Sequence, residues 1–392
     1  MVIDWQWTPS RRAANALIDL AKQAAAAAPE QPKKWVTLAN LVTRVRGHRE
    51  ALLVLMESIR HCPDDAELRF MAAQAYFALG EFERGLEECD RALHLNPGYE
   101  QAQLLRSSLL VKTKGLVAAK PLLDFAVEAD LSRTYVFEYL CTRLSEPGVA
   151  EDMLERCDRA MANGARSSQP VYFKALALAK LGDTATARAM LSLDEALLLS
   201  TPETPPGYQS AEAFRAKLAD EILNHPSLSA DPRGKSTSGG GQTDPLREDD
   251  GPATAALFGL VRGAVESYAS GINGTDRSNS GAHPLKCSLQ VWATVLGPQG
   301  KQDIHRHPDG WLSGVYYVRA PWSEQANRFC GDLLVGIVDE DLGIGTPWDV
   351  RRIEPIPGRM VIFPSYVPHA TEPSNAAGER ISVAFDVIRI DQ

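Results

Sequence analysis

Three of the eight histidines lie in the part of the chain richest in predicted strands, two in His305-Arg306-His307 and one at His369. On an extended segment, residues i and i+2 point to the same face, so His305 and His307 can be directed at one point while Arg306 points away. Pro308 favours an extended conformation for His307. Because imidazole nitrogens are common metal ligands, this pattern predicts a metal site built from one strand and one distant segment.

Asp309 lies one step further along the same segment and can join that face. A His-x-His or His-x-Asp pair on one strand, together with a distant histidine, is typical of the facial triad of non-haem iron(II) oxygenases, which leaves three coordination positions open. Those positions admit a 2-oxo acid and dioxygen beside the substrate. A site of three histidines also suits zinc. The residue types therefore leave open whether His307 or Asp309 is the third ligand.

A second pair of polar side chains follows His369 in the sequence. Arg380 and Ser382 lie in the alternating run RISVAFDV, so they share one face of a predicted strand. A guanidinium can bind a carboxylate through two parallel hydrogen bonds, and a serine hydroxyl adds another. The pair is therefore suited to holding the far carboxylate of 2-oxoglutarate, on a strand next to the metal site.

These candidate residues lie within or between the members of a series of predicted short strands. Five segments alternate in hydrophobicity, are rich in β-branched and aromatic residues, and are separated by Gly, Pro and Asp. Short strands in series predict a barrel or a sandwich. Helices are expected just before them, at 210–225 and 252–270. The predicted strand segments are 287–296, 311–320, 332–340, 358–366 and 380–390.

The first 200 residues instead predict helices, because Ala, Leu and Glu are abundant there. Pro29, Pro63 and Pro97 are spaced 34 residues apart, the length of a tetratricopeptide repeat. Such a helix-turn-helix unit must stack on its neighbours to bury its apolar face. We count four to five units, with the pattern clearest in 32–65 and 66–99. The matching positions in these two units are Trp35, Leu38, Ala39, Ala51, Tyr76, Gly80 and Ala92.

The proline-rich segment 201–207 marks the change from predicted helices to predicted strands. We therefore predict a multidomain α + β chain, with a helical tetratricopeptide-repeat solenoid over 1–203 and a strand-rich domain over 204–392. Residues 226–252 are interpreted either as a Gly/Ser-type linker or as a loop of the second domain.

Three runs, 305–318, 363–369 and 380–385, together resemble one known family. They are similar to bacterial 2-oxoglutarate- and Fe(II)-dependent oxygenases related to prolyl hydroxylases, whose members can carry tetratricopeptide repeats. The similarity extends upstream to about residue 208. It implies a double-stranded β-helix, or jelly roll, with flanking helices for 204–392. It also implies Fe(II) as cofactor, with 2-oxoglutarate and dioxygen as cosubstrates.

The same resemblance assigns roles to individual residues. His305, His307 and His369 match iron ligands, and the alignment of residues 313–318 with the corresponding strand of prolyl hydroxylases favours His307 over Asp309. No catalytic residue is expected beyond the iron centre. The cosubstrate site is matched by Arg380 and Ser382, with Tyr317 as a further contact and Trp292 near the entrance.

The expected activity is hydroxylation of an aliphatic C–H bond in a peptide, protein or amino-acid substrate. The groove of the repeats would bind that substrate or a partner protein. One alternative is a non-catalytic repeat scaffold with a vestigial barrel. Another is a cupin-like metalloenzyme that does not use 2-oxoglutarate.

Bulk properties exclude other classes of partner. A net charge of -9 argues against a nucleic-acid role, because binding to phosphates requires a basic surface. No apolar run approaches the roughly 20 residues of a membrane span, so no membrane association is expected. The N-terminus lacks a basic stretch followed by an apolar core, and we therefore expect a cytoplasmic protein.

Overall fold

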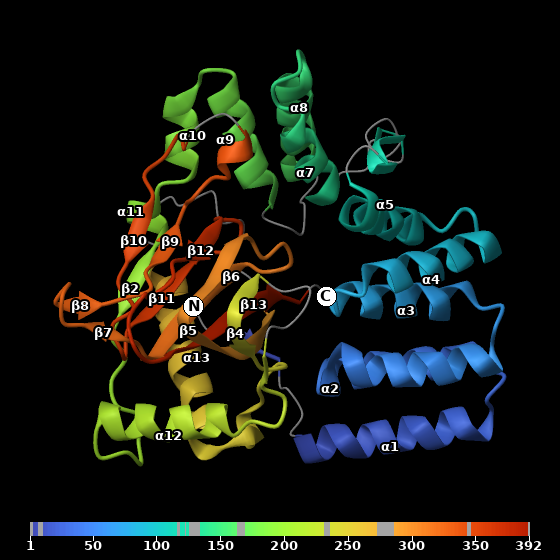
Figure 1. The fold of residues 1–392 in the computed structure, drawn as a ribbon, viewed down its shortest axis with the longest axis horizontal. Helices are drawn as coiled ribbons and strands as arrows, with labels where there is room; N and C mark the ends of the chain where they lie inside the picture. Colours follow the sequence, from blue (N-terminus) through green and yellow to red (C-terminus); the bar gives the residue numbers. More distant parts are fainter. Residues whose placement is uncertain are drawn as a thin grey trace. The chain divides into compact units, whose positions relative to one another are not determined.

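The computed structural model describes residues 3–6, 11–115, 118–121, 123–124, 134–162, 169–230, 236–272, 286–342 and 346–390. The chain divides into two compact units, whose elements are drawn in Figure 1. The smaller unit comprises residues 9–131 and 232–235, and the larger comprises residues 1–8, 132–231 and 236–392.

The smaller unit consists, over its described part, of helices that stack one on the next (Figure 1). Gly47 has a φ of 82° inside α2, so this segment forms both helices of the 32–65 repeat. Asp65 ends the turn that follows, and its side chain accepts a hydrogen bond from the Leu68 amide at 2.9 Å as an N-cap. The helices are α1 (Arg11–Ala27), α2 (Pro32–His61), α3 (Ala66–Ala78), α4 (Phe82–Leu95) and α5 (Glu100–Lys114).

The residues that define the repeat pattern are core residues of this unit. Trp35, Leu38, Ala39 and Ala51 are buried in one apolar cluster, and the Trp35 indole donates a hydrogen bond to the Pro29 carbonyl at 2.8 Å. The alanines let neighbouring helices approach closely, and the burial of the large side chains stabilises the stack. The predicted helical repeat region at the N-terminus is confirmed.

Further helices belong to the larger unit, although the sequence-based domain boundary falls after them, between residues 203 and 204. The compact units instead divide at 131/132. The physical reason is packing: the Tyr172 ring lies edge-on to Trp348 at 6.1 Å, and the Tyr268 hydroxyl donates to the Ala196 carbonyl at 2.8 Å. These helices are α7 (Thr134–Thr142), α8 (Val149–Ala162), α9 (Gln169–Lys180), α10 (Thr184–Met190) and α11 (Leu193–Ala196).

The core of the larger unit is a curled, mainly antiparallel sheet with the order β10-β9-β12-β5-β13-β6-β11-β2. The strands of this path are β2 (Leu198–Ser200), β5 (Lys286–His305), β6 (Leu312–Arg319), β9 (Leu333–Val335), β10 (Arg351–Ile353), β11 (Met360–Pro364), β12 (His369–Thr371) and β13 (Arg380–Arg389). Additional short strands are β1 (Asp4–Trp5), β3 (Ser229–Ala230) and β4 (Thr237–Gln242), with β7 (Trp322–Ser323) and β8 (Arg328–Phe329) forming a separate hairpin.

Strand β5 carries the curl of this sheet. Its 20 residues pair with β13 over 287–296 and then with β12 at Gln302 and His305. A strand of this length can change partners along its course because the twist of a sheet accumulates with length. The end of β5 is thereby directed toward β12, which begins at His369.

The two faces of β13 meet different surroundings because alternate side chains of a strand point in opposite directions. Ile381, Val383 and Phe385 are buried in a cluster with side chains of α12 (Ala211–Leu223) and α13 (Pro252–Ile272). Figure 1 shows these two helices on one side of the sheet. Arg380 and Ser382 point to the opposite face. The predicted combination of repeat helices with a sheet domain and flanking helices is confirmed.

The segment 226–252 is built partly into the sheet. Strand β4 pairs with β5 from Thr237 to Gln242, and Ser229 and Ala230 pair with β4. The short helix η1 (Glu248–Asp250) follows, and residues 231–235 lie outside the described part. None of the helices in the described ranges has both the length and the apolar character required to span a bilayer.

Candidate metal centre and cosubstrate pocket

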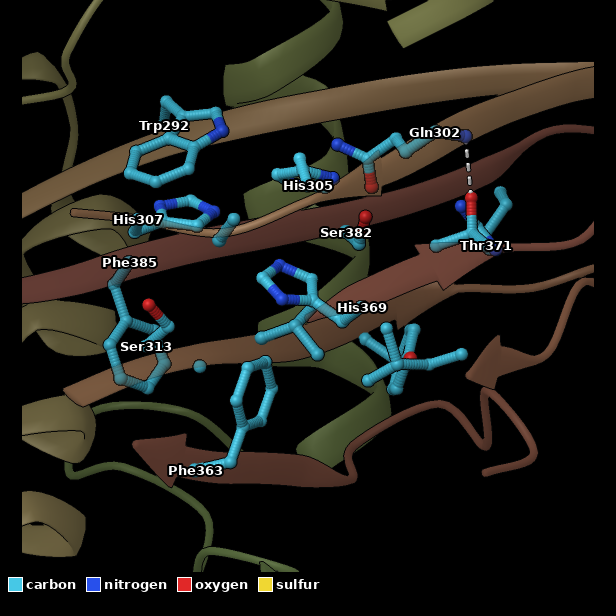
Figure 2. A pocket seen from close by; sticks show the side chains of 16 residues that line it. Trp292, Gln302, His305, His307, Ser313, Phe363, His369, Thr371, Ser382 and Phe385 are labelled. Carbon is cyan, nitrogen blue, oxygen red and sulfur yellow. Dashed lines mark hydrogen bonds between the residues drawn. The ribbon is translucent and has the colours of Figure 1, made fainter. Parts of the chain in front are cut away.

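Three imidazole rings converge at the junction of β5 and β12. His305 ends β5 and pairs across the sheet with His369, which begins β12. His307 follows two residues later, and one nitrogen of each ring lies within 4.8 Å of the others. The ring centroids of His305 and His369 are 4.3 Å apart, and each is 5.1 Å from that of His307. Figure 2 shows the three rings facing one another inside a pocket.

Hydrogen bonds determine which nitrogen of each ring faces the cluster. Nδ1 of His305 lies 2.7 Å from the Asp303 carbonyl, and Nδ1 of His369 lies 3.1 Å from the Val367 carbonyl. A carbonyl oxygen can only accept, so each Nδ1 carries the proton and each Nε2 keeps a lone pair. Nε2 of His307 is buried without a hydrogen-bond partner among the described residues. Three lone pairs directed at one point fit a divalent cation.

The protonation state of the rings agrees with this interpretation. Burial, with the neighbouring His307 as a smaller cause, lowers the pKa of His305 to about 4. Burial, followed by His305 and His307, lowers the pKa of His369 well below its usual value. Both rings are therefore neutral near pH 7, which is the form that binds metal ions.

A buried carboxylate supports the third ring. Asp386 Oδ2 accepts a hydrogen bond from Nδ1 of His307 at 2.6 Å, and its Oδ1 accepts one from the Ser313 hydroxyl at 2.7 Å. The Ser313 and Ser365 hydroxyls are 2.8 Å apart. Asp386 was not among the predicted site residues, yet the alternation of RISVAFD places it on the face of Arg380 and Ser382, four residues beyond Ser382. That spacing was the available signal.

Asp309 is placed differently from the histidines. It lies exposed in the turn after His307, and the group of potential metal ligands found among the described residues contains the three histidines and no carboxylate. The amide of Gly310 donates to the His307 carbonyl at 3.2 Å, which closes this turn. Asp309 is therefore directed to solvent. The carboxylate that interacts with the cluster is that of Asp386, which hydrogen-bonds to His307.

The predicted cosubstrate residues line the same pocket as the histidines. Ser382 and Tyr317 are direct neighbours on β13 and β6, and both are buried together with Arg380. Arg380 donates one hydrogen bond to the Gly331 carbonyl, while its Nε is buried without a partner among the described residues. Burial lowers the pKa of Arg380 and raises that of Tyr317 to about 12. A buried guanidinium that makes no ion pair within the described residues is suited to bind an anion.

Aromatic rings close the pocket around the histidines (Figure 2). The Trp292 ring stacks on His307 with centroids 5.6 Å apart, and the Phe363 ring lies edge-on to His369 at 4.8 Å. Gln302 and Thr371 complete the polar lining, and the backbone N–H of Gln302 donates a 2.8 Å hydrogen bond to the Thr371 hydroxyl. Neither residue was singled out from the sequence, because their contact depends on the pairing of β5 with β12.

Comparison with known families agrees with this geometry. Residues 290–386 match the family model described as "Putative 2OG-Fe(II) oxygenase", in which 2OG stands for 2-oxoglutarate. The matched range contains the three histidines, Arg380 and Asp386. The chain combines tetratricopeptide repeats with a 2OG-Fe(II) oxygenase domain. We refer to residues 290–386 and the strands around them as the oxygenase domain.

Curated relatives are similar to part of this chain. The tetratricopeptide repeat and J domain-containing co-chaperone DNJ1 of Fusarium oxysporum f. sp. lycopersici is 26% identical over 196 residues, which is 47% of this chain and 37% of the relative. The TPR repeat-containing thioredoxin TTL4 of Arabidopsis thaliana is 31% identical over 150 residues, 36% of this chain and 22% of the relative. The chain therefore spans well under half the length of these relatives.

Among solved structures, a prolyl-4-hydroxylase from Pseudomonas putida is similar to this chain with a TM-score of 0.37 and 18% identity. The similarity covers 53% of this chain and 99% of the prolyl-4-hydroxylase.

Proposed function

We propose that the chain is a 2-oxoglutarate- and Fe(II)-dependent dioxygenase that hydroxylates an aliphatic C–H bond of a peptide, protein or amino-acid substrate. The observation that supports this best is the shared pocket of Arg380 and the three histidines. A cluster of neutral imidazoles suits a metal with open positions, and a buried guanidinium in the same pocket suits a dicarboxylate that also reaches the metal.

In this proposal His305, His307 and His369 hold Fe(II), and Arg380 with Ser382 and Tyr317 holds the far carboxylate of 2-oxoglutarate. Bound iron supplies the redox chemistry by which 2-oxoglutarate gives succinate and CO₂, with one atom of dioxygen entering succinate and the other the substrate hydroxyl. Asp386 keeps the proton on Nδ1 of His307, so that Nε2 remains a ligand atom.

The aromatic side chains have a separate role in the proposal. Trp292 and Phe363 lie against His307 and His369, and they exclude bulk water from the metal's surroundings. A dry site protects a reactive centre from side reactions with solvent. The repeats of the N-terminal region are proposed to bind the substrate or a partner protein, as stacked helical repeats present an extended surface.

The test is anaerobic addition of Fe(II) and 2-oxoglutarate, followed by oxygen. We expect a weak visible charge-transfer band before oxygen is admitted and succinate afterwards. His305→Ala and His369→Ala should abolish the band, while His94→Ala, which changes an exposed histidine of α4, should leave it intact. Absence of both the band and succinate in the unaltered protein would contradict the proposal and favour a scaffold. A bound metal without dependence on 2-oxoglutarate would favour a cupin-like enzyme.

A further inference from the structure

A second cavity adjoins the three-histidine pocket within the larger unit. It has a volume of about 370 Å³ and lies between helices α7 and α9 and the segment that follows β5. His305 lines both cavities, so they meet at a candidate metal ligand. Ile304 and Pro308 at its rim are exposed, and the cavity therefore opens to solvent.

Arg306 attaches the two helices to the histidine segment. Its guanidinium lies over the rings of Tyr172 and Phe173, 4.5 and 4.6 Å from their centroids. It donates hydrogen bonds to Gln169 Oε1 at 2.5 Å and to Glu138 Oε1 at 3.1 Å. Arg306 stands between the two histidines and points away from them, so the contacts that hold α7 and α9 in place are made by the metal-binding segment itself.

Gln169 adds a second connection to the same segment. Its side chain is buried, and its amide nitrogen donates to the His307 carbonyl at 3.4 Å. The Arg306 guanidinium is thus held both by aromatic stacking and by hydrogen bonds, which together fix its orientation more strongly than either alone. Helices α7 and α9 therefore form a wall of this cavity, next to His305.

The lining of this cavity carries a net negative charge. Its lining contains the carboxylates of Glu138 and Asp339 and a single guanidinium, that of Arg306. The Arg306 guanidinium forms an ion pair with Glu138 and lies over the two rings, so the two carboxylates leave one negative charge in excess. Gln169 and His305 add neutral polar groups, and aromatic and apolar side chains, among them Tyr172 and Ile304, provide the rest of the surface. A basic side chain with a long apolar stem matches this combination, because its stem packs on apolar surface while its charge meets a carboxylate.

We propose that this cavity binds the segment of a polypeptide substrate next to the hydroxylated residue, and that it selects a lysine or arginine there. The inference rests on the proposed dioxygenase function and adds the substrate class. A free amino acid would leave most of the open cavity unfilled, whereas a peptide chain can continue past the exposed rim. Glu138 and Tyr172 are the specificity-determining residues of the proposal.

The experiment uses the full chain with Fe(II), 2-oxoglutarate and three pools of random ten-residue peptides, each with a fixed central Lys, Glu or Leu. Product is measured as a gain of one oxygen atom in the peptide mass and as succinate formed above the rate without peptide. We expect the Lys pool to exceed the Glu pool by about fivefold, which corresponds to one partly exposed ion pair. Free lysine should give no stimulation.

Glu138→Gln should reduce this preference to less than about twofold, because it removes one carboxylate and leaves Arg306 without its ionic partner. Glu151→Gln, which changes an exposed acid of α8 outside the cavity, is the matched control and should keep the preference of the unaltered protein. Circular dichroism reports whether each variant folds. If Glu138→Gln does not fold, the comparison of the three pools in the unaltered protein tests the proposal.

Equal use of the three pools, preference for the Glu pool, or stimulation by free lysine alone would overturn the inference. Succinate formation without peptide separates this failure from failure of the proposed function. If 2-oxoglutarate turnover without peptide is present and the Lys pool has no advantage, only the cavity assignment is wrong. If no succinate forms under any condition, the dioxygenase proposal itself is wrong and the cavity assignment falls with it.

Discussion

His307 and Asp386 form a partly buried imidazole–carboxylate pair, with Nδ1 of the histidine 2.6 Å from Oδ2 of the aspartate. The aspartate is 7% exposed and also accepts a hydrogen bond from the Ser313 hydroxyl. Its carboxylate thus lies behind a candidate ligand, where it orients the ring and fixes the proton on Nδ1. In a facial triad that contains an aspartate, by contrast, the aspartate carboxylate is itself a metal ligand.

Replacing Asp386 by asparagine should weaken Fe(II) binding by about 10- to 100-fold, the usual effect of losing a carboxylate behind a metal-binding histidine. The amide can present its NH₂ group to Nδ1 and so favour the wrong tautomer. Anaerobic Fe(II) titration measures the change. Asp220→Asn is the control, because it changes an exposed carboxylate of α12 outside the pocket lining. An unchanged affinity in Asp386→Asn would show that the pair does not support the metal site.

Replacing Arg380 by methionine should weaken 2-oxoglutarate binding by about 10- to 100-fold, as expected for loss of hydrogen bonds to a charged group. Binding of 2-oxobutyrate, which lacks the far carboxylate, should be nearly the same in both proteins. Titration of the anaerobic charge-transfer band gives both affinities. Arg319→Met, which changes an exposed arginine of β6, should bind 2-oxoglutarate like the unaltered protein.

The same Arg380→Met variant should unfold at a temperature equal to or above that of the unaltered protein when no 2-oxoglutarate is present. The physical reason is that this guanidinium is 2% exposed and makes no ion pair within the described residues, so its burial is costly. Thermal unfolding followed by circular dichroism tests this. A large loss of stability would mean that the hydrogen bond to the Gly331 carbonyl is structurally essential and that anion binding is not the main role of Arg380.

Substitutions of His307 and Asp309, the two candidates for the third metal ligand, should differ in their effect on Fe(II) binding. His307→Ala should abolish or strongly weaken Fe(II) binding, whereas Asp309→Ala should leave it unchanged, because Asp309 is exposed in a turn. Metal content after anaerobic loading and gel filtration distinguishes them. The reverse result would place Asp309 on the metal and require the turn to rearrange on metal binding.

Gly314→Ala should destabilise the oxygenase domain by about 1–3 kcal/mol. A Cβ at this position would lie 2.3 Å from Cζ of Phe385 and 2.6 Å from the Val361 carbonyl oxygen, so β6 would have to shift within the sheet. Gly259→Ala is the matched control: this exposed helical position of α13 has no atom within 4 Å of the added Cβ. It should stabilise by about 0.5–1 kcal/mol. Urea unfolding measures both changes, and equal effects would contradict the packing argument.

Several parts of this structure follow from local sequence patterns. The 34-residue spacing of prolines predicted the repeats, and the two-residue periods predicted that His305 and His307, like Arg380 and Ser382, share a face. Such patterns are informative because the backbone period of a helix or strand determines which side chains lie together, whatever the rest of the chain does. Strands β6, β11 and β13 and helices α12 and α13 were predictable for the same reason, whereas β10, β12 and the part of β5 beyond residue 296 were not predicted.

Only the tertiary structure decided which distant segments meet. The pairing of His369 with His305, the contact of Asp386 with His307, and the position of Arg306 between Tyr172 and Phe173 join residues far apart in the sequence. The assignment of α7 to α11 to the unit that contains the sheet is of the same kind. These relationships depend on strand register and side-chain packing, and a local period carries no information about which partner a face will meet.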